Sequence, residues 1–272
     1  MIVKPHAKIN IGLIITNKRP DGFHNIETVF FPVPIFDTLI VEPSEKKLVF
    51  VCDGIELPDA DPQNNLCCKA FHLLDADFDL PPTCVRLHKA IPVGAGLGGG
   101  SSDATYTLQA LNDLYKLQIT KEKLAHYASR LGSDCAFFLQ KSPSFATGRG
   151  DVLEPINLSL AGYYVLIVKP QVFISTAEAY SSVKPRKTLR HLPDLLKAPI
   201  CDWRETIFND FEETIFSKFP KTGQIKEQLY DFGAVYASLS GSGASVYGIF
   251  KENPDKIAEQ FRECFTFCFK CG

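Results

Sequence analysis

The chain has 272 residues, of which 45% are hydrophobic and 22% are charged. This length suffices for one large domain or two of ordinary size, and the composition is that of a folded globular protein. The 29 Lys and Arg residues nearly balance the 31 Asp and Glu residues, without a run of five like charges. Binding to nucleic acid or to a membrane surface therefore has no electrostatic support.

The N-terminal stretch "MIVKPHAKINIGLIIT" lacks the pattern of a signal peptide. Asn10 and Gly12 interrupt its apolar residues, and no small-residue cleavage site follows. Apolar runs elsewhere are too short for a membrane span. Nine cysteines without a secretory signal indicate a reducing compartment, in which thiols stay free. We therefore expect a cytoplasmic protein.

Strands and one tight turn are expected in the first ninety residues. Apolar residues alternate with Lys8, Asn10 and Gly12 over residues 7–13, which predicts a strand that carries these three on one face. The turn "RPDGFH" follows, because Pro and Gly favour turn geometry. Further strands are expected at residues 26–33, 37–43, 47–52 and 83–93. In the last of them, the charged Lys89 shares a face with Val85 and Leu87.

Helices are expected after these strands. Residues 101–115 have helical spacing and Ser101 or Ser102 as a natural N-cap. A second helix is expected at 120–132, and a third at 133–140 with Ser133 or Asp134 near its start.

The second half follows the order strand, helix, strand, strand, helix, strand, which is typical of ferredoxin-like domains. We place a boundary near residue 155 and predict an α+β protein with domains at residues 1–155 and 156–272.

The segment "PVGAGLGGGSSDA", residues 92–104, needs an explanation for its glycines. Gly94, Gly96 and Gly99 satisfy the dinucleotide-binding pattern, but the preceding strand carries charges and the acidic residue at the expected distance lies in a helix. A P-loop needs Lys directly before its Ser, where this chain has Gly100.

A third explanation is a different kind of anion-binding loop, which also holds phosphate oxygens. A glycine-rich loop that leads into a helix exposes backbone N–H groups and the positive end of the helix dipole. The serines add hydroxyl donors or could bind a metal on the phosphates. A flexible linker is the alternative, but linkers do not normally join a strand directly to a well-capped helix.

Three separated motifs resemble those of the GHMP kinases. "PVGAGLGGGSSDA" is similar to their central phosphate-binding motif, "KPHAKINIGL" to the N-terminal motif and "SLSGSGASVYGIF" to the C-terminal glycine motif. "GSDCAFF" and "GRGDVLEPI" also fit this family. The resemblance implies an N-terminal ribosomal-S5-domain-2-like domain for ATP binding and catalysis, and a C-terminal ferredoxin-like GHMP domain.

The segment "RPDGFHNIETVF" resembles the aromatic–His substrate segment of one group within the family. The resemblance implies phosphorylation of the 2-hydroxyl of 4-diphosphocytidyl-2-C-methyl-D-erythritol, on the methylerythritol phosphate route to isoprenoid precursors. ATP is the implied donor, and Mg²⁺ is expected with it. Phe23 stands where a tyrosine is usual in this group, but stacking on a base needs only the ring. Thr105 stands where an alanine is usual, and we expect this difference to be harmless. Another small-molecule GHMP kinase activity is the alternative.

The resemblance also assigns the catalytic pair. It implies that Asp134 accepts the proton of the alcohol and that Lys8 positions the hydroxyl and the transferred phosphoryl group. Without the resemblance, Asp134 is as readily a helix N-cap and Lys8 a solvated strand residue.

The remaining assignments concern the two ligands. The expected ATP-binding residues form one run: Pro92, Val93, Gly94, Ala95, Gly96, Leu97, Gly98, Gly99, Gly100, Ser101 and Ser102. The expected acceptor-binding residues are Asn10, Phe23, His24, Thr176, Tyr180, Ser240, Gly241 and Gly243. Core packing is the alternative for Phe23 and Tyr180, and a plain hairpin loop for residues 240–245.

Two other classes of function remain open from the sequence. Cys264, Cys268 and Cys271 have the spacing of some iron–sulfur sites, but they flank and interrupt a probable edge strand rather than a loop. A non-catalytic sugar-nucleotide sensor is the other, although the presence of both Lys8 and Asp134 favours catalysis. We expect no dedicated metal ligands, and a monomer or weak homodimer.

Overall fold

The computed structural model describes residues 1–59, 61–181, 183, 185 and 191–272. They form two compact units that are interleaved along the chain. Unit 1 contains residues 1–8, 32–93 and 98–141, and unit 2 contains residues 9–31, 94–97 and 142–272. Strands β2 (His6–Lys18) and β3 (His24–Phe36) and the glycine-rich segment each contribute to both units. The sequence boundary near residue 155 stays a prediction.

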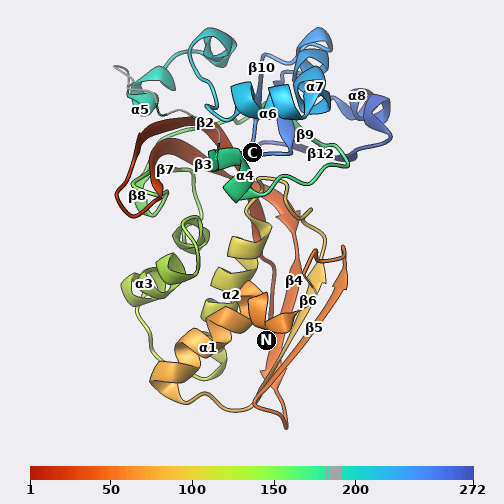
Figure 1. The fold of residues 1–272 in the computed structure, drawn as a ribbon. Helices are drawn as coiled ribbons and strands as arrows, with labels where there is room; N and C mark the ends of the chain where they lie inside the picture. The colour runs from red at the N-terminus through yellow and green to blue at the C-terminus, as the bar shows by residue number, and fades with distance from the viewer. Residues whose placement is uncertain (60, 182, 184, 186–190) are drawn as a thin grey trace. The chain divides into compact units, whose positions relative to one another are not determined.

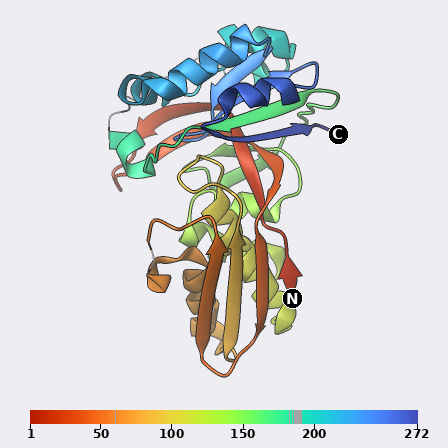
Figure 2. The same ribbon diagram turned by 90° about the vertical axis from the view of Figure 1, so that its right-hand side faces the viewer.

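Unit 1 is a four-stranded sheet with helices on one face (Figures 1 and 2). The sheet order is β1-β4-β6-β5, where only β5 and β6 are parallel. Its strands are β1 (Ile2–Val3), β4 (Thr38–Pro43), β5 (Leu48–Gly54) and β6 (Thr83–Lys89). Its helices are α1 (Leu66–Phe78), α2 (Gly99–Leu114) and α3 (Lys121–Leu131), with the short 3-10 helices η1 (Pro62–Asn64) and η2 (Cys135–Leu139).

The core of unit 1 lies between this sheet and the helices. Val85 and Leu87 on β6 pack with Leu108 and Leu111 on α2, and all four side chains are buried. The alternation in β6 confirms the predicted strand, with exposed side chains on its opposite face. Helix α1 was not expected from the sequence; Asn65 caps it by accepting a hydrogen bond from Cys67 N.

The start of α2 differs from the prediction. Neither Ser101 nor Ser102 is the N-cap, because the helix already begins at Gly99 and the N-cap is Gly98. Gly98 adopts φ +71°, a left-handed conformation that glycine reaches without steric cost. Residues 135–139 form a short 3-10 helix rather than the predicted third α-helix.

The first sheet of unit 2 has the order β2-β3-β7-β8, with β7 (Ser144–Thr147) and β8 (Val152–Pro155). The turn predicted at "RPDGFH" joins β2 to β3: Arg19 N donates to Phe23 O at 2.8 Å, and Gly22 has φ +87°. Phe23 and His24 are therefore carried at the tip of a two-stranded hairpin.

The second sheet of unit 2 has the order β10-β11-β9-β12 and is antiparallel throughout. Its strands are β9 (Tyr164–Lys169), β10 (Tyr236–Leu239), β11 (Val246–Phe250) and β12 (Phe265–Lys270). This strand order and the alternation with helices confirm the predicted ferredoxin-like topology, and β12 lies at an edge as predicted. The helices of unit 2 are α4 (Thr176–Ser181), α5 (Leu192–Leu195), α6 (Glu212–Lys218), α7 (Pro220–Asp231) and α8 (Asp255–Ala258), with η3 (Ile200–Glu205) and η4 (Glu259–Phe261).

Helices α6 and α7 cover one face of this sheet (Figures 1 and 2). Ile215 on α6 and Ile225 and Leu229 on α7 are buried in the same core as Leu166 and Val246 of the sheet.

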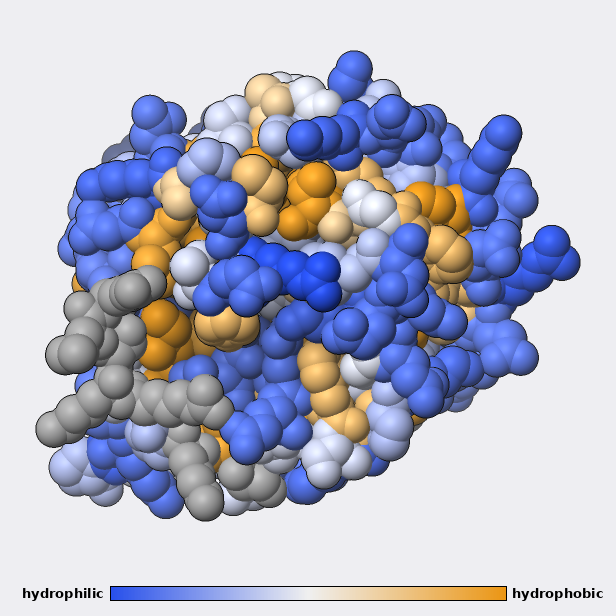
Figure 3. All heavy atoms as spheres, turned by 90° about the horizontal axis from the view of Figure 1, so that it is seen from above, coloured by the Kyte–Doolittle hydropathy of each residue, from blue (hydrophilic) through white to orange (hydrophobic). Residues whose placement is uncertain are grey.

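On the face shown in Figure 3, most of the surface is hydrophilic and the apolar side chains form patches between polar ones. Among the described residues, every helix is too short or too polar to cross a bilayer.

A buried charge network ties β6 to α2 in unit 1. Lys89 Nζ donates to Asp103 Oδ2 at 2.8 Å and to Asp37, and all three side chains are 3% exposed or less. Asp37 Oδ1 also accepts hydrogen bonds from Ala90 N at 2.6 Å and Ile91 N at 2.8 Å. The network thus fixes both the chain that enters the glycine-rich segment and the helix that leaves it.

The second oxygen of Asp103, Oδ1, has no hydrogen-bond partner in the described parts of the chain. Burial raises the pKa of Asp103 to about 7, against the attraction of Lys89. Asp103 therefore holds a proton in the folded state at pH values where an unfolded aspartate, with a pKa of about 3.9, has lost it.

We predict that the contribution of Asp103 to the free energy of unfolding falls as pH rises from about 4 to 7, because only the folded state binds this proton in that window. Urea denaturation at four pH values measures the slope. Asp103→Asn should remove this decrease. His6, whose pKa is lowered by burial, acts in the opposite direction but is present in both proteins. Parallel pH profiles for parent and variant would contradict the prediction.

Candidate active site

Lys8 and Asp134 form an ion pair within unit 1. Lys8 Nζ lies 3.2 Å from Asp134 Oδ2, and the side chains are 3% and 30% exposed. Lys8 comes from β2, and Asp134 directly precedes η2. The sequence also allowed a capping role for Asp134, but its side chain makes no capping hydrogen bond. Its carboxylate is paired with a buried cation and still reaches solvent, so it can meet a hydroxyl group.

The N-terminus of α2 lies beside Lys8. The helix has no side-chain cap, so its first backbone N–H groups and the positive end of its dipole are available to an anion. Gly98 has to be glycine here: a Cβ would lie 2.8 Å from Phe138 Cζ and 3.0 Å from Lys8 Cε. Gly99 packs against the charge network in the same way, because its Cβ would lie 2.8 Å from Lys89 Nζ.

The other unit 1 residues of the glycine-rich segment differ in exposure. Pro92 is buried, Val93 and Ser101 are half-buried, and Gly100 is exposed. Ser102 is completely buried, and its Oγ has no hydrogen-bond partner among the described residues. Of the two predicted serine hydroxyls, Ser101 is therefore the one that solvent reaches.

In unit 2, residues Gly94–Leu97 pack directly against the C-terminal glycine loop at residues 240–245. Ala244 N donates to Gly94 O at 3.2 Å, Ser245 N to Ala95 O at 3.1 Å, and Ser240 Oγ to Gly96 O at 2.9 Å. A Cβ on Gly96 would lie 1.9 Å from Ser240 O. The two glycine-rich motifs, nearly 150 residues apart, thus form one backbone-lined structure.

The segment that follows β9 covers both loops within unit 2. The ring of Phe173 lies over Gly94, where a Cβ would come within 2.5 Å of it, and Ile174 packs on Gly243. Thr176 Oγ1 lies 3.5 Å from Ser242 Oγ. The structure therefore brings Thr176 to the loop that contains Ser240, Gly241 and Gly243. No sequence pattern pointed to Phe173.

Asn10 is buried beside the same loop. Its backbone N–H donates to Ser240 Oγ at 3.3 Å, and its side-chain Nδ2 donates to Thr28 Oγ1 at 2.9 Å. The carboxamide oxygen lies against Gly241, where a Cβ would come within 3.2 Å of it. Asn10 is 2% exposed, so its position is well determined by neighbours before any ligand arrives.

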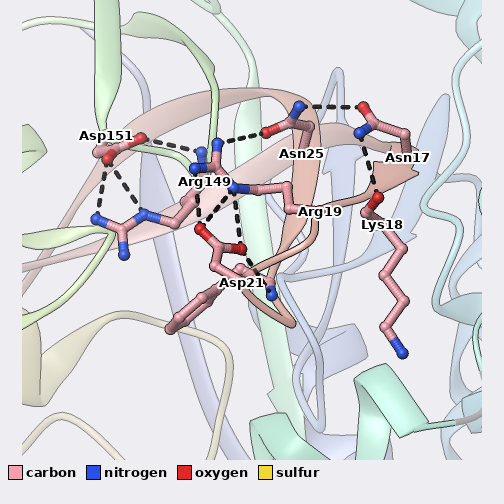
Figure 4. A network of polar contacts seen from close by, with 8 residues as sticks. Asn17, Lys18, Arg19, Asp21, Asn25, Arg149 and Asp151 are labelled. Atoms are coloured by element: carbon pink, nitrogen blue, oxygen red, sulfur yellow. Dashed lines mark hydrogen bonds and ion pairs between the residues drawn. The ribbon is translucent and has the colours of Figure 1, made fainter.

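Phe23 is exposed at the hairpin tip, with 52% of its surface accessible. The tip is braced by polar contacts (Figure 4), among which Arg19 binds Asp21 and donates to Asn25 Oδ1 at 3.1 Å. Asp21 Oδ1 in turn accepts a hydrogen bond from Phe23 N at 3.1 Å. The core-packing alternative for Phe23 is therefore wrong.

His24 and Tyr180 lie together in unit 2. Their rings are stacked, with centroids 5.0 Å apart and planes at 22°, and Tyr180 meets Phe211 edge-on. The prediction paired Phe23 with Tyr180 around a base, whereas the ring that faces Tyr180 is His24. Burial lowers the pKa of His24, with the Lys18 charge acting in the same direction. A neutral imidazole can both donate and accept a hydrogen bond.

The C-terminal cysteines lie on and beside the edge strand. Cys264 precedes β12, Cys268 lies within it and Cys271 follows it. In residues 1–59, 61–181, 183, 185 and 191–272, no group of three or more His, Cys, Asp and Glu side chains is placed to hold a metal ion. The geometry thus gives the iron–sulfur alternative no support.

Comparison with known proteins agrees with the arrangement of these motifs. The family model "GHMP kinases N terminal domain" matches residues 65–142, and "GHMP kinases C terminal" matches residues 193–266. The chain is 46% identical to a Bacteroides fragilis protein named 4-diphosphocytidyl-2-C-methyl-D-erythritol kinase, covering 99% of this chain and 98% of the relative. Identity to the protein of the same name from Bacteroides thetaiotaomicron is 48%, covering 99% of each.

A solved structure shows the same fold. The crystal structure of a 4-(cytidine 5'-diphospho)-2C-methyl-D-erythritol kinase matches with a TM-score of 0.84 and 30% identity, covering 100% of this chain and 99% of that one. The fold is thus the two-domain α+β fold of the GHMP kinases. The chain therefore belongs to the GHMP kinase family and, within it, to the group of 4-diphosphocytidyl-2-C-methyl-D-erythritol kinases.

Proposed function

We propose that this chain transfers the γ-phosphoryl group of ATP to the 2-hydroxyl of 4-diphosphocytidyl-2-C-methyl-D-erythritol, on the methylerythritol phosphate route to isoprenoid precursors. Relatives of this name match nearly the whole chain at 46–48% identity. The structural observation that carries the proposal is the ion pair between buried Lys8 and partly exposed Asp134. Phosphoryl transfer to an alcohol needs a proton acceptor and a nearby positive charge, and this pair supplies both.

Asp134 is the proposed general base. The alcohol oxygen forms a bond to the γ-phosphorus while the bond to the β–γ bridging oxygen breaks, and the hydroxyl proton passes to the Asp134 carboxylate. ADP leaves with the bridging oxygen. Lys8 is placed to orient the Asp134 carboxylate through their ion pair and to offset negative charge on the transferred group.

The uncapped N-terminus of α2 and the glycine-rich backbone are proposed to bind the phosphates of ATP. Residues 98–101 form the N-terminus of α2 next to Lys8, and residues 94–97 pack against the loop at residues 240–245 in unit 2. Mg²⁺ usually binds nucleotides through their phosphates and several waters, with few protein ligands. The absence of a dedicated ligand cluster among the described residues is therefore compatible with Mg²⁺ that is brought by ATP.

The cytidine part of the acceptor is proposed to bind at the rings of unit 2. Phe23 offers an exposed ring, and a nucleobase stacks well on such a surface. His24, whose pKa is lowered by burial, is proposed to hydrogen-bond the edge of the base. Tyr180 is the second ring, provided that the base replaces or joins His24 on its face. Asn10, Thr176 and the loop of Ser240, Gly241 and Gly243 are proposed to contact the rest of the acceptor.

Asp134→Asn should lower turnover by about 10²- to 10⁴-fold, the usual contribution of a positioned base. ADP release measures turnover, and titration with a non-hydrolysable ATP analogue should give nearly unchanged affinity. The fold should survive, because Asp134 caps no helix. Asp113→Asn on α2, an exposed aspartate of the same unit, is the control that should keep full activity. Near-parent turnover of the Asp134 variant would contradict the mechanism.

His24→Ala should weaken binding of cytidine 5'-diphosphate about tenfold or more, because an edge contact to the base is lost. The parent should bind uridine 5'-diphosphate much more weakly than the cytidine nucleotide, and the variant should narrow this gap. Calorimetry with both nucleotides measures the four affinities. His126→Ala, at an exposed histidine of unit 1, should leave them unchanged. Equal affinity of the parent for both nucleotides would remove the cytidine assignment and leave a GHMP kinase for another alcohol.

A further inference from the structure

The turn between β7 and β8 contains the "GRGD" part of a family-like motif for which the mechanism above has no use. Its central residue, Arg149, lies over the ring of Phe23, with the guanidinium carbon 5.1 Å from the ring centroid. Both residues belong to unit 2, and they come from different hairpins. The exposed ring that is proposed to hold the cytosine is thus covered on one face by a cation.

Arg149 is held firmly in this position. Its Nε and Nη2 lie 3.4 and 3.2 Å from Asp151 Oδ2, while Asp151 Oδ1 accepts a hydrogen bond from Arg149 N at 2.9 Å (Figure 4). Gly148 and Gly150 flank it with φ +65° and +102°, which lets the chain turn tightly. Gly148 O also accepts a hydrogen bond from Ile26 N at 2.8 Å, which joins the turn to β3.

The hairpin tip that carries Phe23 is braced separately. Arg19 and Asp21 form an ion pair at 2.9 Å, and Asn25 bridges Arg19 to Asn17 (Figure 4). These contacts fix the backbone at Phe23 but leave its ring 52% exposed. Among the described residues, Arg149 is the only cation placed over this ring. The contacts of Arg19 and Asp21 therefore hold the backbone of the hairpin tip, whereas Arg149 contacts the Phe23 ring itself.

We propose that Arg149 is a positioning residue for the acceptor: its guanidinium covers one face of the Phe23 ring and holds the other face toward the cytosine. A cation over the face of an aromatic ring is attracted by the π electrons, and Arg lies flat on rings more readily than Lys. The ring then needs to give up less conformational freedom when the base stacks on it. This inference rests on the proposed function, because it assumes that Phe23 stacks on a base.

The guanidinium could instead bind the diphosphate of the acceptor directly. The two roles differ in what they predict. A contact to phosphate would matter for cytidine 5'-diphosphate but not for cytidine, whereas support of the ring would matter equally for both. If Arg149 supports the ring, its effect on affinity should also disappear when Phe23 is replaced by alanine, because Arg149 then has no ring to position.

The test compares cytidine and cytidine 5'-diphosphate by calorimetry on the whole protein. Arg149→Ala should weaken both by the same factor, about threefold to tenfold. Arg149→Lys should recover part of the loss because it keeps the charge. In a Phe23→Ala background, Arg149→Ala should cause no further loss. Arg86→Ala, at an exposed arginine paired with Glu42 in unit 1, is the control and should change neither affinity.

Steady-state kinetics give the second measurement. The KM for the cytidyl alcohol should rise in Arg149→Ala by the same factor, with the KM for ATP unchanged. A loss confined to the diphosphate, a loss that persists without Phe23, or unchanged cytidine affinity would each overturn the proposal. If the parent phosphorylates a different alcohol and does not bind cytidine, the proposed acceptor is wrong, and the role of Arg149 is overturned with it. If the parent phosphorylates the cytidyl alcohol and Arg149→Ala changes neither the cytidine affinity nor the KM for this alcohol, only the proposed role of Arg149 is overturned.

Discussion

The geometry of unit 1 depends most on the buried ion pairs that the Lys89 ammonium group forms with Asp37 and Asp103. The ammonium group donates hydrogen bonds to both Asp37 and Asp103, so a charge that would be costly alone in the core is paired and hydrogen-bonded. Asp37 also holds the two backbone N–H groups that follow β6, and Asp103 belongs to the first turns of α2. The strand, the glycine-rich segment and the helix are therefore fixed together at the point where the phosphates are proposed to bind.

Glycine serves two different purposes in this segment. At Gly98 and Gly99 it makes room for Lys8 and Lys89 side chains at the uncapped start of α2. At Gly94 and Gly96 it allows Phe173 and the backbone of Ser240 to pack directly on the loop in unit 2. A side chain at any of these positions would collide with a group that packs directly on the segment, which explains why so much bare backbone is concentrated in one stretch.

Much of the fold follows from local patterns in the sequence. Alternation predicted β2 and β6, and the turn residues Pro20 and Gly22 placed the hairpin tip, because these signals depend only on neighbouring residues. The β-α-β-β-α-β order of the second half predicted a ferredoxin-like sheet. The motifs identified the family and selected Lys8, Asp134 and both glycine loops. Even the unexpected Lys89 had a signal, since it shares an apolar strand face with Val85 and Leu87.

Long-range packing decided the rest. The sequence determined the family and the chemical groups that its reaction needs, but it left Asp134 as either a cap or a base. Only the tertiary structure shows that its side chain caps no helix and pairs with Lys8 instead. The sequence predicted Ser101 or Ser102 as the N-cap of α2, whereas the observed N-cap is Gly98. Its left-handed conformation places it against Phe138 and Lys8, which only the tertiary structure brings there. The stacking of His24 on Tyr180 and the contact of Arg149 with the Phe23 ring join residues far apart in the chain. Local propensity carries no information about such partners, because they are set by where the tertiary structure places each strand and turn.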